Sequence, residues 1–211
     1  SQFATTLYNA VFWGGYQDIE HRPHSYYISR YPEGIEATVN WTSPDLRFRN
    51  NSNSAILIDT RYTDTSITVR IFGNNDGRTV KGQQIGGKLE LNVVRQGGPN
   101  ARVVEATVSD RFAIREPPAP KYEADPSLGL NQVVTKQSPS QGWSVEVVRR
   151  ILVGEREVSR EAWTVVYRPQ QAIYAVHPCK IPGQEHTCPT TTTAPPTTTT
   201  TSPGSEGDGG D

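Results

Sequence analysis

Helical periodicity is confined to one short segment of this chain, whereas strand-like alternation recurs along much of the rest. In residues 2–13 (QFATTLYNAVFW), apolar side chains repeat at helical spacing, and Tyr8 and Phe12 extend the apolar surface to another face. We therefore expect one helix that is buried on most sides and ends at Gly14-Gly15. One buried helix accompanied by strands predicts an α+β fold with antiparallel strands.

Strand signals follow an irregular stretch, residues 16–53, that is rich in proline and aromatic side chains. Residues 55–61 (AILIDTR) and 66–72 (SITVRIF) flank the polar turn 62–65, which predicts a hairpin. Residues 73–87 are predicted to form a loop. Further strands are expected at 88–95, 102–109, 111–115, 131–136, 143–152, 156–168 and 172–176, with Gly154 at the turn of a second, long hairpin.

Proline marks the predicted boundary between domains. The segment 116–126 (EPPAPKYEADP) has four prolines and few large apolar residues, which indicates an extended, stiff connection. We therefore predict one α+β domain at residues 1–115 and an elongated, all-β accessory module at 116–178. The Thr/Pro/Gly-rich tail, 189–211, cannot bury enough apolar surface to offset its ordering entropy, so we expect it to be disordered.

The two cysteines, Cys179 and Cys188, lie close together beside this tail. Next to a Thr/Pro-rich stalk, they are best explained as one disulfide formed outside the cytoplasm, which would close a loop over residues 179–188. Two His-x-Cys pairs, which add His177 and His186, also offer the four ligand types of a tetrahedral zinc site. The extracytoplasmic context favours the disulfide, and we predict no metal and no cofactor.

Charge and hydropathy argue against two classes of partner. A formal net charge of −1 gives no electrostatic reason to expect binding to nucleic acid or to an anionic membrane. No apolar run approaches the roughly 18–20 residues of a membrane span, so membrane contact would need a segment outside this sequence. Because the sequence has no methionine and begins at Ser1, we expect it to be part of a longer protein.

Three blocks in the first third of the chain carry a family resemblance. The blocks TTLYNAVFWGG (5–15), EHRPHSYYISRYPEGIEATVNW (20–41) and DLRFRNNSNSAILI (45–58) resemble the VanW-like family in order and spacing. This is a family of bacterial envelope proteins, one member of which accompanies a glycopeptide-resistance cluster. The resemblance covers about residues 1–74, and it implies that a glycine-rich stretch of the family would end near Ser1-Gln2.

A second resemblance covers about residues 117–177. The motifs EADPSLG (123–129), VVRRILVGEREVSREAW (147–163) and VYRP (166–169) are similar to the domain named for its five glycines, the G-five domain. The full set of glycines is not present, but three glycines fit the pattern, namely Gly129, Gly142 and Gly154. That domain is often proposed to bind polymers that contain N-acetylglucosamine, so both resemblances imply an extracytoplasmic protein of the bacterial envelope.

The densest group of reactive side chains lies in residues 20–27. Glu20, either His21 or His24, and Ser25 supply an orienting group, a base and a nucleophile, which acyl transfer requires. Neighbouring residues of an extended chain point in different directions, so the same side chains also fit a role in fixing the shape of the loop.

Binding candidates lie on or near the first predicted hairpin. Arg61 and Arg70 are expected to be cross-strand neighbours on one face, with Arg47 and Arg49 nearby. Together with Trp41, they could form a groove for an acidic, sugar-bearing polymer, because aromatic faces pack on sugar rings and guanidinium groups hold carboxylates. An ordinary solvated sheet face would have the same composition.

The sequence therefore predicts a cell-envelope protein associated with peptidoglycan, with a non-catalytic role in binding glycan or wall. The alternative is an enzyme that acts on peptidoglycan peptides or precursors through the His24-Ser25 loop. A purely structural spacer is a third hypothesis. No enzyme class follows from these patterns.

Overall fold

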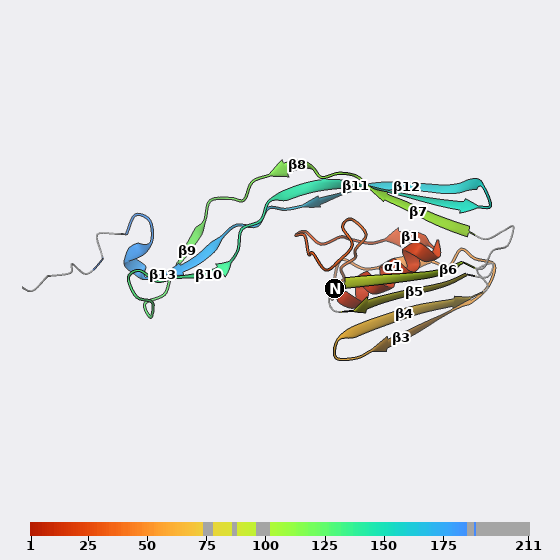
Figure 1. Ribbon diagram of the computed structural model, residues 1–211, viewed down its shortest axis with the longest axis horizontal. Helices are drawn as coiled ribbons and strands as arrows, with labels where there is room; N and C mark the ends of the chain where they lie inside the picture. The colour runs from red at the N-terminus through yellow and green to blue at the C-terminus, as the bar shows by residue number, and fades with distance from the viewer. Residues whose placement is uncertain (74–77, 86–87, 96–101, 185–187, 189–211) are drawn as a thin grey trace, which may run out of the picture. The chain divides into compact units, whose positions relative to one another are not determined.

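The computed structural model describes residues 1–73, 78–85, 88–95, 102–184 and 188 (Figure 1). In this part of the chain one α-helix accompanies mostly antiparallel sheets, which confirms the predicted combination of a helix with antiparallel strands. The chain divides into two compact units. The first comprises residues 1–121 and 135–174, and the second comprises the described residues of 122–134 and 175–211.

Helix α1 spans Gln2–Gly14, as the apolar spacing predicts. It ends where Gly15 adopts the left-handed conformation, with φ of 74°, and donates its N–H to the carbonyl of Phe12 at 3.2 Å. Tyr8, Val11 and Phe12 are all buried although they lie on different sides of the helix. A helix buried in this way needs packing partners on more than one side.

One partner of α1 is a four-stranded sheet in the order β3-β4-β5-β6 (Figure 1). Its strands are β3 (Ile56–Tyr62), β4 (Ser66–Gly73), β5 (Arg78–Ile85) and β6 (Lys88–Arg95). The predicted β3–β4 hairpin is confirmed, and its register places Ile58 opposite Ile71. The predicted loop over residues 73–87 is wrong, since β5 occupies most of it. Pairing with β4 and β6 holds β5 in the sheet although its sequence lacks apolar alternation.

The other partner of α1 is a sheet in the order β12-β11-β7, and β8 also pairs with β11. Its strands are β7 (Arg102–Val108), β8 (Phe112–Arg115), β11 (Gly142–Val153) and β12 (Arg156–Tyr167). The long hairpin predicted around Gly154 is confirmed, because β11 and β12 pair antiparallel from Trp143–Tyr167 to Val153–Arg156.

The hydrophobic core joins α1 to both sheets. Tyr8 and Phe12 pack with Val147 of β11, while Val11 packs with Val69 of β4. Strands β7 and β8 pair with β11, which follows the proline-rich segment in the chain. A proline-rich segment shows where the chain is extended, and it does not show which strands pair across it.

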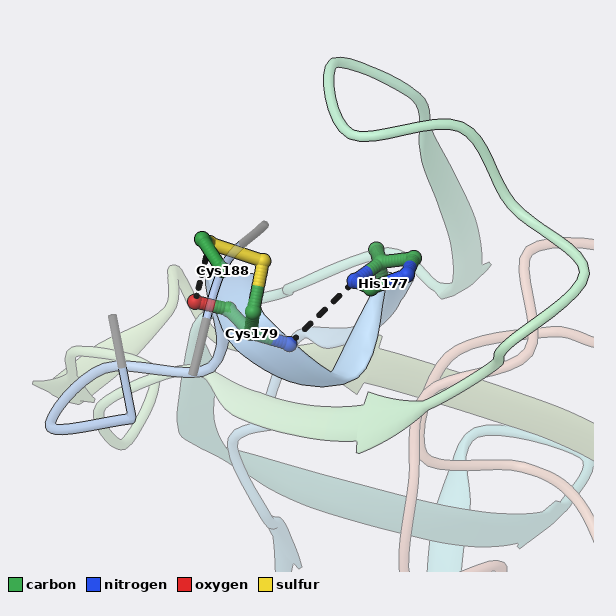
Figure 2. The surroundings of a disulfide bond; sticks show 3 residues. All are labelled: His177, Cys179 and Cys188. Carbon is green, nitrogen blue, oxygen red and sulfur yellow. Dashed lines mark hydrogen bonds between the residues drawn. A yellow bond between two sulfur atoms is a disulfide. The ribbon is translucent and has the colours of Figure 1, made fainter. Parts of the chain in front are cut away.

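Three short strands form a small sheet of their own. Strands β9 (Lys121–Ala124), β10 (Val133–Gln137) and β13 (Ile173–Val176) pair in the order β10-β13-β9, and the 3-10 helix η1 (Pro178–Lys180) follows. The predicted disulfide between Cys179 and Cys188 is confirmed, with Cα atoms 4.7 Å apart (Figure 2). In Figure 2, His177 accepts a hydrogen bond from the Cys179 N–H through its Nδ1 atom. The predicted disordered tail lies outside the described residues.

Candidate functional site

Most predicted site residues lie on β1 (Gln17–Glu20), on β2 (Arg47–Arg49) or in the long connection between these two strands. The two strands pair antiparallel, so they close the base of this connection, residues 21–46. Tyr31, Ile35 and Ala37 within it are buried, and Ile35 and Ala37 belong to the core that contains α1 and β11. The connection is therefore an ordered part of the first unit.

His24 belongs to a buried hydrogen-bonded network that fixes this connection on β12. Its Nδ1 atom lies 2.5 Å from Oε2 of Glu36, a carboxylate that is only 1% exposed. The Tyr167 hydroxyl donates to Oε1 of Glu36 at 2.6 Å and accepts the Gly34 N–H at 2.8 Å. Burial, reinforced by the bond to Glu36, raises the pKa of Tyr167 above its ordinary value, so the hydroxyl remains a donor at neutral pH.

Gly34 shows how closely the connection approaches β11. Its φ is +75°, and a Cβ atom at this position would lie 2.5 Å from Cγ2 of Val147. Both the backbone conformation and the contact therefore require glycine. The Trp163 indole adds a further tie, since its N–H donates to the Gly34 carbonyl at 3.3 Å.

His21 belongs to a second network, which ties the connection to α1. Its Nδ1 atom lies 2.5 Å from Oδ2 of Asp18, and its Nε2 atom lies 3.2 Å from the Tyr8 hydroxyl. The imidazole also stacks on the Tyr8 ring, with centroids 4.4 Å apart, and meets the edge of Trp163. The Tyr8 hydroxyl also donates to Oδ2 of Asp18 at 3.4 Å. Burial, and secondarily the charge of Asp18, raises the pKa of Tyr8, so this hydroxyl remains protonated at neutral pH.

A third anchor involves Arg111, between β7 and β8. Its guanidinium lies over the Trp143 ring at 4.0 Å from the centroid and also faces the Tyr27 ring at 5.1 Å. Glu33 accepts hydrogen bonds from Arg111, the shorter at 2.9 Å, and from the Trp143 indole at 2.5 Å. The hydrogen bond with Glu33 is the main cause of a raised pKa for Arg111. These contacts hold both ends of the segment 27–33 against β11.

The predicted catalytic group is not assembled as a nucleophile with its base. Ser25 is exposed, and its backbone carbonyl accepts the Arg168 N–H at 2.7 Å. His24 is turned to Glu36, and its Nε2 atom is buried with no hydrogen-bond partner among the described residues. Glu20 faces Arg47 at 3.7 Å rather than either histidine. In the described structure the partners of these residues are therefore Glu36, Arg47 and the Arg168 backbone.

The predicted arginine candidates separate into two places. Arg47 and Arg49 lie on β2, where Arg49 donates to Gln17 at 3.4 Å. Arg61 of β3 and Arg70 of β4 share a face, but they are diagonal neighbours rather than direct partners. Both contact the same carboxylate, Asp59, at 3.4 Å. Each of these guanidinium groups already contacts a carboxylate or an amide, and the four arginines do not form one basic groove.

Trp41, the fifth binding candidate, lies instead on a groove beside α1. The groove has a volume of about 630 Å³. Its lining combines an apolar floor with an exposed indole and two polar side chains, and consists of Phe3, Ala4, Leu7, Val39, Asn40, Trp41, Asp45 and Leu46. Trp41 is fully exposed, and we refer to this feature below as the Trp41 groove.

Local hydrogen bonds fix the polar rim of the Trp41 groove. Oδ1 of Asn40 accepts the Trp41 N–H, and Oδ1 of Asp45 accepts the Leu46 N–H, both at 2.8 Å. The Asn40 N–H donates to the Pro44 carbonyl at 3.0 Å, which closes the turn. These bonds use one oxygen of each side chain, so the amide nitrogen of Asn40 and the second oxygen of Asp45 can bond to a ligand.

Several residues that build these sites gave no signal in the sequence. Glu36 and Tyr167 come from distant segments and meet only in the folded chain, as do Tyr8 and His21 in the second network. The described residues contain no group of three or more His, Cys, Asp or Glu side chains arranged to hold a metal ion. Across the same residues, the helix is too short to span a membrane.

The first third of the chain matches a known protein family. Residues 1–72 match the family described as VanW like protein. This stretch is VanW-like. The match confirms the resemblance that the three sequence blocks predict. An uncharacterized protein of Bacillus subtilis (strain 168), YoaR, is 34% identical to this chain over 74 residues, which are 35% of this chain and 24% of that protein.

The chain therefore matches about a quarter of the length of this curated relative.

Two solved structures of G5 domains also resemble the chain. One, described as an IgA1 protease G5 domain, is 25% identical and covers 38% of this chain and 96% of its own, with a TM-score of 0.23. The other, HP0197-G5, is 17% identical and covers 36% and 96%, with a TM-score of 0.18.

Proposed function

We propose that this chain is a non-catalytic, glycan-binding part of an extracytoplasmic protein of the bacterial cell envelope, and that the Trp41 groove receives wall glycan. The observation that carries the proposal is a fully exposed indole above an apolar floor, beside a fixed amide and a fixed carboxylate. Sugar rings present apolar C–H faces that pack on aromatic rings, while their hydroxyls bond to side chains such as Asn40 and Asp45.

The geometry favours a neutral, N-acetylated sugar over an acidic one. The polar groups on the rim are an amide and a carboxylate, and none of the described residues that line the groove is an arginine or a lysine. A carboxylate accepts hydrogen bonds from hydroxyl and amide groups but repels an anionic ligand. N-acetylglucosamine residues of peptidoglycan fit this requirement, and the apolar floor offers a surface for the acetyl methyl group.

Two further observations support a location outside the cytoplasm. The first is the VanW-like stretch, because the resemblance implies an envelope protein. The second is the Cys179–Cys188 disulfide, since disulfides persist in oxidising compartments.

The proposal is tested by sedimentation of the purified chain with isolated peptidoglycan. Removal of the indole in Trp41→Ala should weaken binding roughly tenfold or more, since the stacked ring supplies the main apolar contact. The matched control is Tyr26→Ala, which removes an exposed aromatic ring outside the groove and should bind as the parent does. Equal binding by the Trp41→Ala variant and the parent would refute the proposal.

Mass spectrometry of the muropeptides in the same samples separates binding from catalysis. A binding module should leave the muropeptides unchanged. New or missing muropeptides would instead support an enzyme and direct attention to His24 and Ser25.

A further inference from the structure

Strand β3 (Ile56–Tyr62) forms an open edge of the four-stranded sheet. Among the described strands it pairs with β4 alone. Exposed edges are commonly protected by proline, lysine or a bulge, which hinder pairing with another chain. The sequence of β3, ILIDTRY, has neither proline nor lysine, and its register with β4 runs without a shift.

The direction of the backbone groups on β3 follows from the turn of the hairpin. The Thr63 N–H donates to the Ser66 carbonyl at 2.9 Å, so Thr63 and Ser66 form a hydrogen-bonded pair. Hydrogen-bonded and non-hydrogen-bonded pairs alternate along antiparallel strands. The N–H and C=O groups of Ile58, Thr60 and Tyr62 therefore point away from β4, toward the open edge.

The side chains at this edge are also uncovered. Helix α1 packs against β4, β5 and β6, and Ile58 and Tyr62 on the helix side remain 39% and 88% exposed. On the opposite face Leu57 is 64% exposed. The edge thus offers unpaired backbone groups together with apolar surface on both faces of the sheet.

We propose that β3 pairs antiparallel with β3 of a second copy of this chain, with Thr60 of the two copies facing each other at the twofold axis. In this register Asp59 of each copy faces Arg61 of the other, and Ile58 faces Tyr62. The Thr60–Thr60 pair and the two Ile58–Tyr62 pairs would each exchange two backbone hydrogen bonds, which makes about six in all. This interface is independent of the Trp41 groove and goes beyond the proposed glycan binding.

Charge selects this register over its neighbour. A shift that centres the pairing on Asp59 would place two like charges directly opposite each other, which is unfavourable. In the proposed register the Arg70 guanidinium can keep its 3.4 Å contact with Asp59, while Arg61, which is mostly exposed, reaches across to the second copy. Each Asp59 would then lie between its own Arg70 and the Arg61 of the other copy.

The proposal predicts that the intact chain dimerises as its concentration is raised through the micromolar range, measured by sedimentation equilibrium. Arg61→Glu would place Asp59 opposite Glu, and Asp59→Lys would place Lys opposite Arg61. Each single variant should therefore weaken the dimer on the order of tenfold. An equimolar mixture of the two variants should restore it, because both facing pairs in the mixed dimer have opposite charges.

Restoration in the mixture also shows that the single variants are folded. As a matched control, Arg47→Glu reverses an arginine on β2 that is similarly exposed and also contacts a carboxylate, and it should dimerise as the parent does. A chain that stays monomeric at all concentrations would overturn the proposal. So would two single variants that dimerise normally, or a mixture that does not recover.

Discussion

The hairpins β3–β4 and β11–β12 show similar alternation in sequence but have different surroundings. Strand β11 has β12 on one side and β7 on the other, and its face with Val145, Val147 and Ile151 is buried. Among the described strands β3 pairs with β4 alone, and Ile58 of β3 is 39% exposed while its partner Ile71 is 1% exposed. Alternation shows which side chains share a face, whereas the neighbouring elements decide whether that face is buried.

Arg149 illustrates the difference, because it is a charged residue on the buried face of β11. It is 1% exposed and forms an ion pair at 3.0 Å with Glu161, its cross-strand partner. It also donates to the carbonyls of Phe12 at 2.6 Å and Tyr16 at 3.0 Å. The guanidinium thus satisfies carbonyls at the end of α1, where a helix lacks internal partners and favours a positive charge.

The largest effect is therefore expected from Arg149→Ala. This change removes the ion-pair partner of Glu161 and one donor to each of the carbonyls of Phe12 and Tyr16, and it should lower the free energy of unfolding by about 3–5 kcal/mol. Urea denaturation followed by circular dichroism measures the loss. The control is Arg150→Ala on the same strand, whose exposed side chain faces Glu157 and Glu105 and whose removal should change stability little. Equal losses in the two variants would contradict the role assigned to Arg149.

The next largest effect on the free energy of unfolding is expected at one of two isoleucines that face each other in one hairpin. Ile71→Ala should cost about 2–5 kcal/mol because it opens a cavity in the core beneath α1, whereas Ile58→Ala should cost well under about 1 kcal/mol. Both changes remove the same atoms, and the two residues face each other in one hairpin. Denaturation should be measured at concentrations where the chain is monomeric, since Ile58 also lies in the proposed dimer interface. A cost for Ile58→Ala as large as that for Ile71→Ala would show that β3 is covered in solution.

The smallest effect is a pH dependence that belongs to the buried tyrosines. Burial raises the pKa of Tyr167 and Tyr8 in the folded chain above the ordinary value of 10.0. Their contribution to stability is therefore fully present below pH 10 and is lost above it, because the unfolded chain releases these protons first. The loss is about 1.4 kcal/mol per pH unit for each tyrosine.

Urea denaturation between pH 9 and pH 11 tests this dependence. The Tyr167→Phe and Tyr8→Phe variants should start from lower stability, since each loses a buried hydrogen bond, but their stability should fall less steeply with pH. An unchanged slope in both variants would contradict the assignment.

The sequence identified the segment that carries the candidate residues but not their arrangement. It singled out Trp41, His21 and His24, and the structure places all three in or beside the connection between β1 and β2. It did not predict that His24 bonds to Glu36 or that Tyr167 bonds to the same carboxylate, because these contacts join separate segments of the chain. Ser25 and His24 appeared as possible partners because they are adjacent, yet adjacent side chains on an extended chain are directed apart.

Local patterns determined the helix over residues 2–13, its stop at Gly14-Gly15, the two hairpins and the disulfide. Each depends on periodicity or proximity within a few residues, which the sequence displays directly. Only the tertiary structure decided that β5 is a strand, that β7 and β8 belong with β11, and that α1 lies between two sheets. Segments far away in the chain supply the hydrogen bonds of those elements and bury their side chains. The residues of the elements themselves therefore give little indication of where they pack.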